Sequence, residues 1–143
     1  SARTMTITEI LYYLDLHDND CWVADGEVYL DTNTSISLPN IEEIKESLKL
    51  RILNNEFAKS RGWLVAHFGE VYQYQYSLNG HLLIERNPDE TVDIYRCRFD
   101  VSGKATHIKG LSEGISFSEA YQKAHAFLDW FYLNNPQLTR RRY

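Results

Sequence analysis

Residues 93–109, DIYRCRFDVSGKATHIK, decide the fold class that we expect for this chain. Two strand-like runs flank Ser102-Gly103, and a Ser-Gly dipeptide between such runs is typical of a turn. The stretch therefore predicts an antiparallel β-hairpin. If the turn holds two residues, the numbers of paired residues sum to 205, and every second side chain lies on the same face.

One face of this hairpin is expected to be basic. In that register the face carries Arg96 paired with Lys109 and Arg98 paired with His107, with Lys104 at the tip. Like charges directly across a strand pair repel each other, so a fold avoids this arrangement unless the face meets an anion or is well solvated. Asp93 and Asp100 offer the alternative, because they are close enough in sequence to neutralise the arginines.

Two further hairpins are predicted on the N-terminal side of this stretch. In CWVADGEVYL, residues 21–30, Asp25-Gly26 suits the two positive-φ positions of a type I′ turn. Further on, EVYQYQYSL, residues 70–78, is expected to turn at Asn79-Gly80 into HLLIER. The sequence thus predicts a sheet built from hairpins.

Three helices are expected around this sheet. Thr6 and Glu9 have capping-box spacing and predict a helix over about 7–16. The second helix is expected to begin after Asn40 and to stop at Gly62. Ser116 with Glu119 begins the third, which should end at Asn135 because Pro136 follows. The stripes that should face the core are Ile41, Ile44, Leu48 and Ile52 in the second helix and Ala120, Ala124, Phe127, Leu128 and Phe131 in the third.

The predicted architecture is α+β, with about three helices packed on one antiparallel sheet in a single domain that spans residues 1–143. The chain is 43% hydrophobic and 24% charged, which is ordinary for one globular domain of this length. Residues 136–143 are expected to form a flexible basic tail, since Arg140, Arg141 and Arg142 follow the last helix.

Charge and cysteine content restrict the function classes. The net charge of −5 is uneven: residues 1–60 carry 5 Lys+Arg against 11 Asp+Glu, and residues 61–143 carry 10 against 9. An anion site must therefore be a local patch in the second part of the chain. No apolar run is long enough to span a bilayer, and SARTMTITEIL shows no signal peptide. With Cys21 and Cys97 far apart, reduced thiols and a cytoplasmic location are expected.

Tyrosines add a second candidate surface. Tyr72, Tyr74 and Tyr76 share one face of their strand. Beside a basic strip such a stripe would suit stacked bases with phosphates alongside. A tyrosine stripe is more often packed beneath a helix, and we prefer this interpretation to a binding surface.

Catalytic and metal signatures are weak. LDLHDNDCW, residues 14–22, gathers Asp15, His17, Asp18 and Asp20, but it lacks the glycine and the twelfth-position Glu of a calcium loop. A polar turn after a helix explains the cluster, so no metal or cofactor is predicted. No GxSxG, GxGxxG or GxxxxGK motif occurs, so serine-hydrolase, dinucleotide and P-loop functions have no support.

Residues 95–131, YRCRFDV through LDWF, resemble small sheet-plus-helix nucleic-acid modules, such as double-stranded-RNA-binding and integrase arm-type domains, in their strand–turn–strand–helix rhythm. The resemblance implies nucleic-acid contact through this part of the chain. The lysines that an RNA-binding helix of this kind presents at its start are absent, because Ser118 and Glu119 stand there.

Three function hypotheses follow, in order of preference. The first is a non-enzymatic binding or regulatory protein whose basic hairpin face contacts an anionic partner, most plausibly nucleic acid, with its basic side chains neutralising phosphates. The second is a protein–protein module, such as a homodimer, that uses the tyrosine stripe or Trp130-Phe131-Tyr132. The third is a small metal-dependent hydrolase that uses the acidic cluster at residues 15–20.

Overall fold

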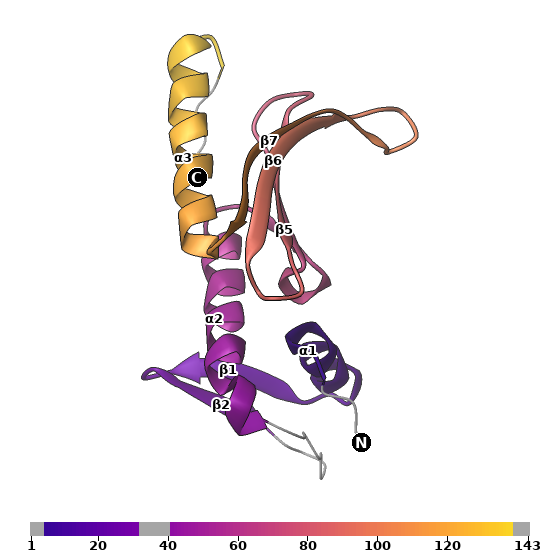
Figure 1. The fold of residues 1–143 in the computed structure, drawn as a ribbon, viewed down its shortest axis with the longest axis vertical. Helices are drawn as coiled ribbons and strands as arrows, with labels where there is room; N and C mark the ends of the chain where they lie inside the picture. Colours follow the sequence, from indigo (N-terminus) through magenta and orange to yellow (C-terminus); the bar gives the residue numbers. More distant parts are fainter. Residues whose placement is uncertain (1–4, 32–40, 139–143) are drawn as a thin grey trace.

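The computed structural model describes residues 5–31 and 41–138 and has an α+β fold with antiparallel sheets (Figure 1). The elements in chain order are α1 (Ile7–Leu16), β1 (Asp20–Ala24), β2 (Glu27–Asp31), α2 (Ile41–Ser60), β3 (Leu64–Ala66), the 3-10 helix η1 (His67–Gly69), β4 (Val71–Gln75), β5 (His81–Arg86), β6 (Val92–Phe99), β7 (Ala105–Ile115) and α3 (Phe117–Asn134). The fold class predicted from the sequence is confirmed.

The N-terminal half consists of α1, the β1–β2 hairpin and the first part of α2, at the lower end of Figure 1. The capping box of α1 is confirmed, because the Thr6 hydroxyl accepts from the Glu9 N–H and Glu9 accepts from the Thr6 N–H. Asp25 and Gly26 take φ values of 52° and 75°, as a type I′ turn requires. A small apolar cluster around Ile7, Leu48 and Ile52 joins these elements.

Helix α2 extends from this half into the other. Gly62 adopts a φ of 83° just beyond its end, and its N–H donates to the Lys59 carbonyl, so the predicted glycine stop is confirmed. The predicted cap at Asn40 lies outside the described residues. Within residues 5–31 and 41–138, no helix combines the length and the apolarity that a bilayer crossing needs.

The larger half is a five-stranded antiparallel meander in the order β3-β4-β5-β6-β7, with α3 packed on one face (Figure 1). The Ser116 hydroxyl caps α3 by accepting from the Glu119 N–H, as predicted. The main core lies between this sheet and α3. Its most deeply buried members are Ala58, Tyr72, Leu82, Ile84, Val92, Ile94, Ala120, Ala124 and Leu128.

The hairpins do not form the one sheet that the sequence analysis expected. Strands β1 and β2 pair only with each other among the described strands, as a separate two-stranded sheet. The 20-residue helix α2 lies between β2 and β3 in the chain, and β1–β2 packs against α2 instead of joining the meander.

The register of the β6–β7 hairpin differs from the predicted one at its tip. The loop holds three residues, Val101 to Gly103, and Asp100 pairs with Lys104. Gly103 adopts a φ of 85°, and the Asp100 carboxylate accepts from the Ser102 and Lys104 N–H groups. A three-residue loop with a left-handed glycine is the next most common hairpin connection after the two-residue turn. The β4–β5 connection also differs, because it spans residues 76–80 rather than Asn79-Gly80 alone.

Candidate functional site

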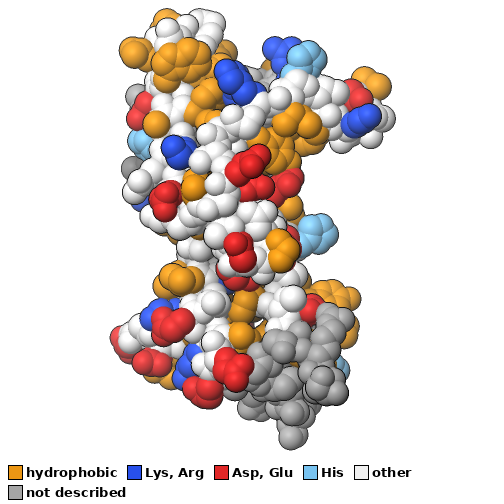
Figure 2. Space-filling model, viewed as in Figure 1, with side chains coloured by type: hydrophobic (Ala, Val, Ile, Leu, Met, Phe, Trp, Pro, Cys, Tyr) orange, Lys and Arg blue, Asp and Glu red, His pale blue; other side chains and the backbone are white. Residues whose placement is uncertain are grey.

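A groove of about 550 Å³ lies between three parts of the larger half. One wall is the β6–β7 hairpin, the second is the β4–β5 loop at residues 76–80, and the third is the C-terminal part of α3 with Leu138. The far end of the hairpin bends away from the upper end of α3 (Figure 1). In Figure 2, a basic side chain lies at the bend between these elements, and acidic side chains lie on the middle and lower parts of that face.

Four of the five predicted basic residues line this groove: Arg96, Arg98, His107 and Lys109. Lys104 does not line it, because it lies in the turn at the tip of the hairpin. No acidic residue is among the described residues that line the groove. The groove is therefore a local concentration of positive charge on a chain whose net charge is −5.

A β-bulge brings the four side chains together. Arg98 pairs with Thr106 rather than with His107, so the predicted Arg98–His107 pair is wrong. His107 takes a φ of 52° at a shift in register, and beyond it Arg96 pairs with Lys109 as predicted. The three-residue loop shifts the pairing by one residue relative to the predicted register, and the extra residue at the bulge reverses this shift. A bulge changes the direction of the side chains beside it.

Asp93 and Asp100 do not neutralise the groove. The Asp93 carboxylate accepts from the Asn87 side chain and from the Gly114 N–H, and these bonds hold the pKa of Asp93 below its ordinary value. Hydrogen bonds within the turn, that from the Ser102 hydroxyl first, likewise lower the pKa of Asp100. None of the five predicted basic residues forms an ion pair with a residue that the structure describes.

Arg96 lies closest to the core. It follows the buried Val92 and Ile94 on the face of β6 that α3 covers, and its guanidinium carbon lies 5.1 Å from the centre of the Phe127 ring. A cation over an aromatic face is attracted to the ring without losing its charge. Arg96 is thereby held in place while its charge remains available to a ligand.

The groove also has an apolar part. Tyr76, Leu78, Phe131 and Leu138 line it, alongside Ser77, Asn79 and Gly80 of the β4–β5 loop. The buried Tyr132 hydroxyl donates to the Tyr76 carbonyl at 3.0 Å, which ties α3 to this loop. Gly80 is required there, because a Cβ at this position would lie 2.4 Å from the Tyr76 ring.

The predicted tyrosine surface is not exposed. Tyr72, Tyr74 and Tyr76 are all buried in the core that α3 covers, which is the arrangement that the sequence analysis placed ahead. Tyr132 is buried as well, whereas Trp130 on the outer side of α3 is 57% exposed.

The acidic cluster at residues 15–20 does not converge on a point. Asp18 adopts a φ of 54° in the turn after α1, and the Asp20 carboxylate accepts from the Cys21 N–H. Burial of the Cys21 thiol, and to a smaller extent the negative charge of Asp20, raises the pKa of Cys21 to about 11. Across residues 5–31 and 41–138, no three His, Cys, Asp or Glu side chains lie where they could hold a metal ion.

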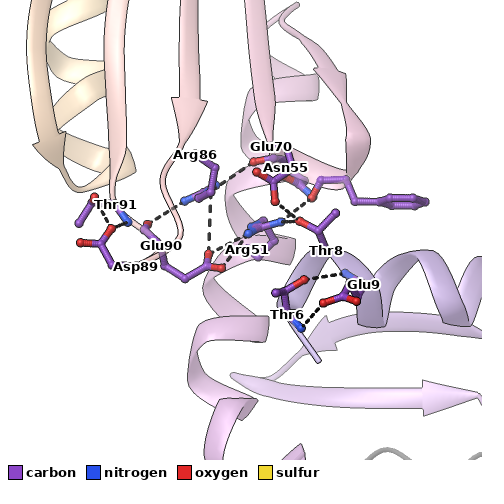
Figure 3. Close-up of polar contacts among 12 residues, drawn as sticks. Thr6, Thr8, Glu9, Arg51, Asn55, Glu70, Arg86, Asp89, Glu90 and Thr91 are labelled. Atoms are coloured by element: carbon purple, nitrogen blue, oxygen red, sulfur yellow. Dashed lines mark hydrogen bonds and ion pairs between the residues drawn. The ribbon is translucent and has the colours of Figure 1, made fainter. Parts of the chain in front are cut away.

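A buried polar network that the sequence analysis missed joins the two halves of the molecule (Figure 3). Arg51 of α2 is only 2% exposed. Its guanidinium donates to the Thr8 hydroxyl at 2.7 Å, to the Phe68 carbonyl at 3.1 Å and to both carboxylate oxygens of Glu90 at 2.8 and 2.9 Å. The signal in the sequence is an arginine three residues after Leu48, on the buried side of an amphipathic helix.

Arg86 of β5 completes this network from the other side. It donates to the Gly69 carbonyl, to the Glu90 carbonyl and, at 2.7 Å, to the Tyr72 hydroxyl. That hydroxyl donates to the Asn55 side chain at 2.6 Å. Burial raises the pKa of Tyr72 although Arg86 and Arg51 act in the opposite direction. We assign this network a structural role, because its charges are paired with groups inside the protein.

Comparison of the chain with protein-family models, with curated proteins and with solved structures finds no match.

Proposed function

We propose that the protein is a non-enzymatic binding or regulatory protein whose groove holds the phosphate backbone of a nucleic acid. One observation supports the proposal. Four basic side chains line one groove, and no acidic residue that the structure describes lines it with them. None of the four forms an ion pair with a described residue. Such a cluster repels itself unless an anion occupies the site, and a row of phosphates matches a row of cations.

The expected role of the four side chains is to position a ligand by charge. Arginine suits this role because its planar guanidinium can bond two phosphate oxygens at once. Contacts with phosphates fix where a nucleic acid lies but do not read its sequence. The proposal therefore predicts affinity for many sequences with a strong dependence on salt. The two cysteines are free thiols, which suits the reducing conditions of the cytoplasm.

A second candidate function is protein–protein contact through the outer side of α3. Trp130 and, one turn away, Leu133 are large exposed apolar residues on that side. Tryptophan is a favoured residue at the centres of protein interfaces. Trp130 belongs to the second surface of the original hypothesis, Trp130-Phe131-Tyr132, rather than to the tyrosine stripe, and it would serve a homodimer or another protein partner.

The test of the first proposal is the salt dependence of binding to pools of single- and double-stranded DNA and RNA. We expect the wild-type protein to lose affinity steeply as salt rises, since each neutralised phosphate contributes about 0.7–0.9 to the slope of log affinity against log salt. The variant Arg96→Ala/Arg98→Ala should bind more weakly, and its slope should be lower by about 2.

The matched control is Lys59→Ala/Arg61→Ala, which removes two exposed positive charges near the end of α2 and so changes the net charge equally. It should bind like the wild type. Equal losses in both variants would show a general charge effect, and the absence of salt-sensitive binding to every pool would overturn the proposal.

A further inference from the structure

We infer that the groove takes a single strand, with one base stacked on Phe131 while the hairpin arginines hold the neighbouring phosphates. This inference rests on the proposed function and narrows it from nucleic acid in general to unpaired DNA or RNA. It also assigns a role to the apolar part of the groove. Neutralisation of phosphates alone would not use these apolar residues.

The walls of the groove differ in chemistry. The hairpin wall supplies the cations, whereas the α3 wall and the loop supply Phe131, Leu138 and Leu78. Leu78 is 87% exposed, although it is a large apolar side chain on a short loop. A duplex presents charged phosphates and sugars on its outside, so it has nothing to place against this apolar wall. A single strand exposes both phosphates and the flat faces of its bases, and sites for such strands combine a basic groove with aromatic side chains.

Phe131 is already held in a fixed position. Its ring lies 4.8 Å from the Tyr76 ring in an edge-on arrangement and 6.0 Å from the Phe127 ring in a nearly parallel one. It is partly buried against the core and lines the groove with the rest of its surface. A ring fixed in this way loses little freedom when a base stacks on it.

The charged and the aromatic parts of the groove are neighbours. The Phe127 ring lies 6.0 Å from the Phe131 ring, and the Arg96 guanidinium carbon lies 5.1 Å from the centre of the same Phe127 ring. A strand bound here would place a base and its adjoining phosphate against neighbouring side chains.

The recessed shape points in the same direction. Elements that read a duplex enter its major groove, as a helix or a two-stranded ribbon does. Here the basic side chains line a hollow between α3, a loop and a hairpin, so a duplex would reach mainly the rim. The element that could enter a duplex is the tip of the hairpin, where Lys104 lies.

The experiment compares three probes of equal length and phosphate number per strand: a single-stranded oligothymidylate, the same strand in a duplex, and a strand of abasic sites. We expect the single strand to bind at least about tenfold more tightly than the abasic strand, since stacking on one aromatic side chain contributes about this much. The single strand should also bind more tightly than the duplex.

Two neighbouring aromatic residues of α3 provide the matched variants. Phe131→Leu should weaken binding of the oligothymidylate about tenfold and leave binding of the abasic strand unchanged. Trp130→Leu is the control, because Trp130 is exposed on the same helix and does not line the groove. Thermal unfolding of each variant verifies that it is folded, and the abasic probe tests the inference on the wild-type protein without any substitution.

The outcomes separate the two claims. If no probe binds in a salt-sensitive way, the proposed function fails. If all probes bind and the abasic strand matches the oligothymidylate, the groove holds phosphates and the stacking inference is overturned. Tighter binding of the duplex, with a loss in Lys104→Ala, would overturn it in favour of the hairpin tip as a duplex reader.

Discussion

The molecule uses arginine in two opposite ways. Arg51 of α2 and Arg86 of β5 form one pair, and Arg96 and Arg98 of β6 form the other. Arg51 and Arg86 are buried, and each donates to carbonyl, hydroxyl or carboxylate groups inside the protein. Arg96 and Arg98 line an open groove, and the structure describes no ion pair for either. The first pair joins the two halves of the molecule, whereas the second pair lines the groove, with Arg96 against the Phe127 ring and Arg98 exposed.

The physical reason for the difference is the cost of removing charge from water. A buried guanidinium without partners is too costly for a fold of ordinary stability, so a buried arginine must be surrounded by acceptors. An arginine at a groove remains solvated and needs no internal partner, and it keeps its charge for a ligand. Burial and pairing therefore distinguish structural arginines from binding arginines here, and four predictions test that distinction.

Arg51→Met should have the largest effect. The substitution removes donors to Thr8, Phe68 and Glu90 and leaves the Glu90 carboxylate with Arg86 alone, 3.9 Å away. Breaking a buried pair costs about 3–5 kcal/mol, and because Glu90 is about one-third exposed we expect about 3 kcal/mol. Urea unfolding measures the loss, and Arg61→Met, an exposed arginine beyond α2, should lose less than about 1 kcal/mol. A loss for Arg51→Met that matches the control would contradict the structural assignment.

Tyr72→Phe should follow, with a loss of about 1–2 kcal/mol in the free energy of unfolding. The hydroxyl bridges Arg86 and Asn55 at 2.7 and 2.6 Å, and its removal leaves two buried polar groups each short of one partner. Tyr12→Phe, on an exposed ring, is the control and should change stability by less than about 0.5 kcal/mol. Binding to oligonucleotides should be the same in both folded variants, since neither side chain lines the groove.

Arg96→Ala and Arg98→Ala should differ in their effect on the free energy of unfolding, with the larger loss for Arg96→Ala. Arg96 loses its contact with the Phe127 ring, so we expect a cost of about 0.5–1 kcal/mol. Arg98 is exposed, and its replacement should stay within about 0.5 kcal/mol. A loss of more than about 1.5 kcal/mol for Arg98→Ala in urea unfolding would mean that it has an internal partner, and the distinction between the two pairs would fail.

The smallest expected effect concerns acid stability. Hydrogen bonds hold the pKa values of Asp93 and Asp100 below the ordinary 3.8, so the stability that they contribute is present above pH 3.8 and is lost as the pH falls through the lowered values. Because these bonds come from Asn87, Ser102 and backbone N–H groups, Arg96→Ala/Arg98→Ala should leave both titrations unchanged. Carboxyl NMR shifts across this pH range measure them. A rise in either pKa in the double variant would show that the carboxylates do neutralise the groove.

Much of the local structure could be predicted because short-range chemistry decides it. Thr6 and Glu9 cap each other three residues apart, and Asp25-Gly26 tolerates the positive φ values of a tight turn. Gly62 and Ser116 mark helix ends for similar reasons, since each acts on backbone groups within one turn. The pairing of Arg96 with Lys109 was also predictable from the alternation of side chains along two paired strands, whereas the position of Arg98 relative to His107 depends on the bulge.

Other features could not be predicted, either because two local arrangements compete or because the partner lies far along the chain. The register at the tip of the β6–β7 hairpin depends on whether the Asp100 carboxylate accepts hydrogen bonds from the N–H groups of the turn. The resulting shift of one residue is compensated by the bulge at His107. The burial of Tyr72 depends on α3, which lies far along the chain. The role of Arg51 depends on Glu90, 39 residues away, and on the Phe68 carbonyl.

The sequence by itself therefore determined most of the helices and strands, the helix caps and which side chains of the hairpin are basic, because each of these depends on residues a few positions apart. Only the tertiary structure decided which arginines are neutralised and which stay available, because that depends on the acceptors that other elements bring within hydrogen-bond distance. It also decided that the basic hairpin lines a groove, since the opposing wall comes from α3 and the β4–β5 loop. Charge available for binding is a property of packing, and packing joins residues that are distant in the chain.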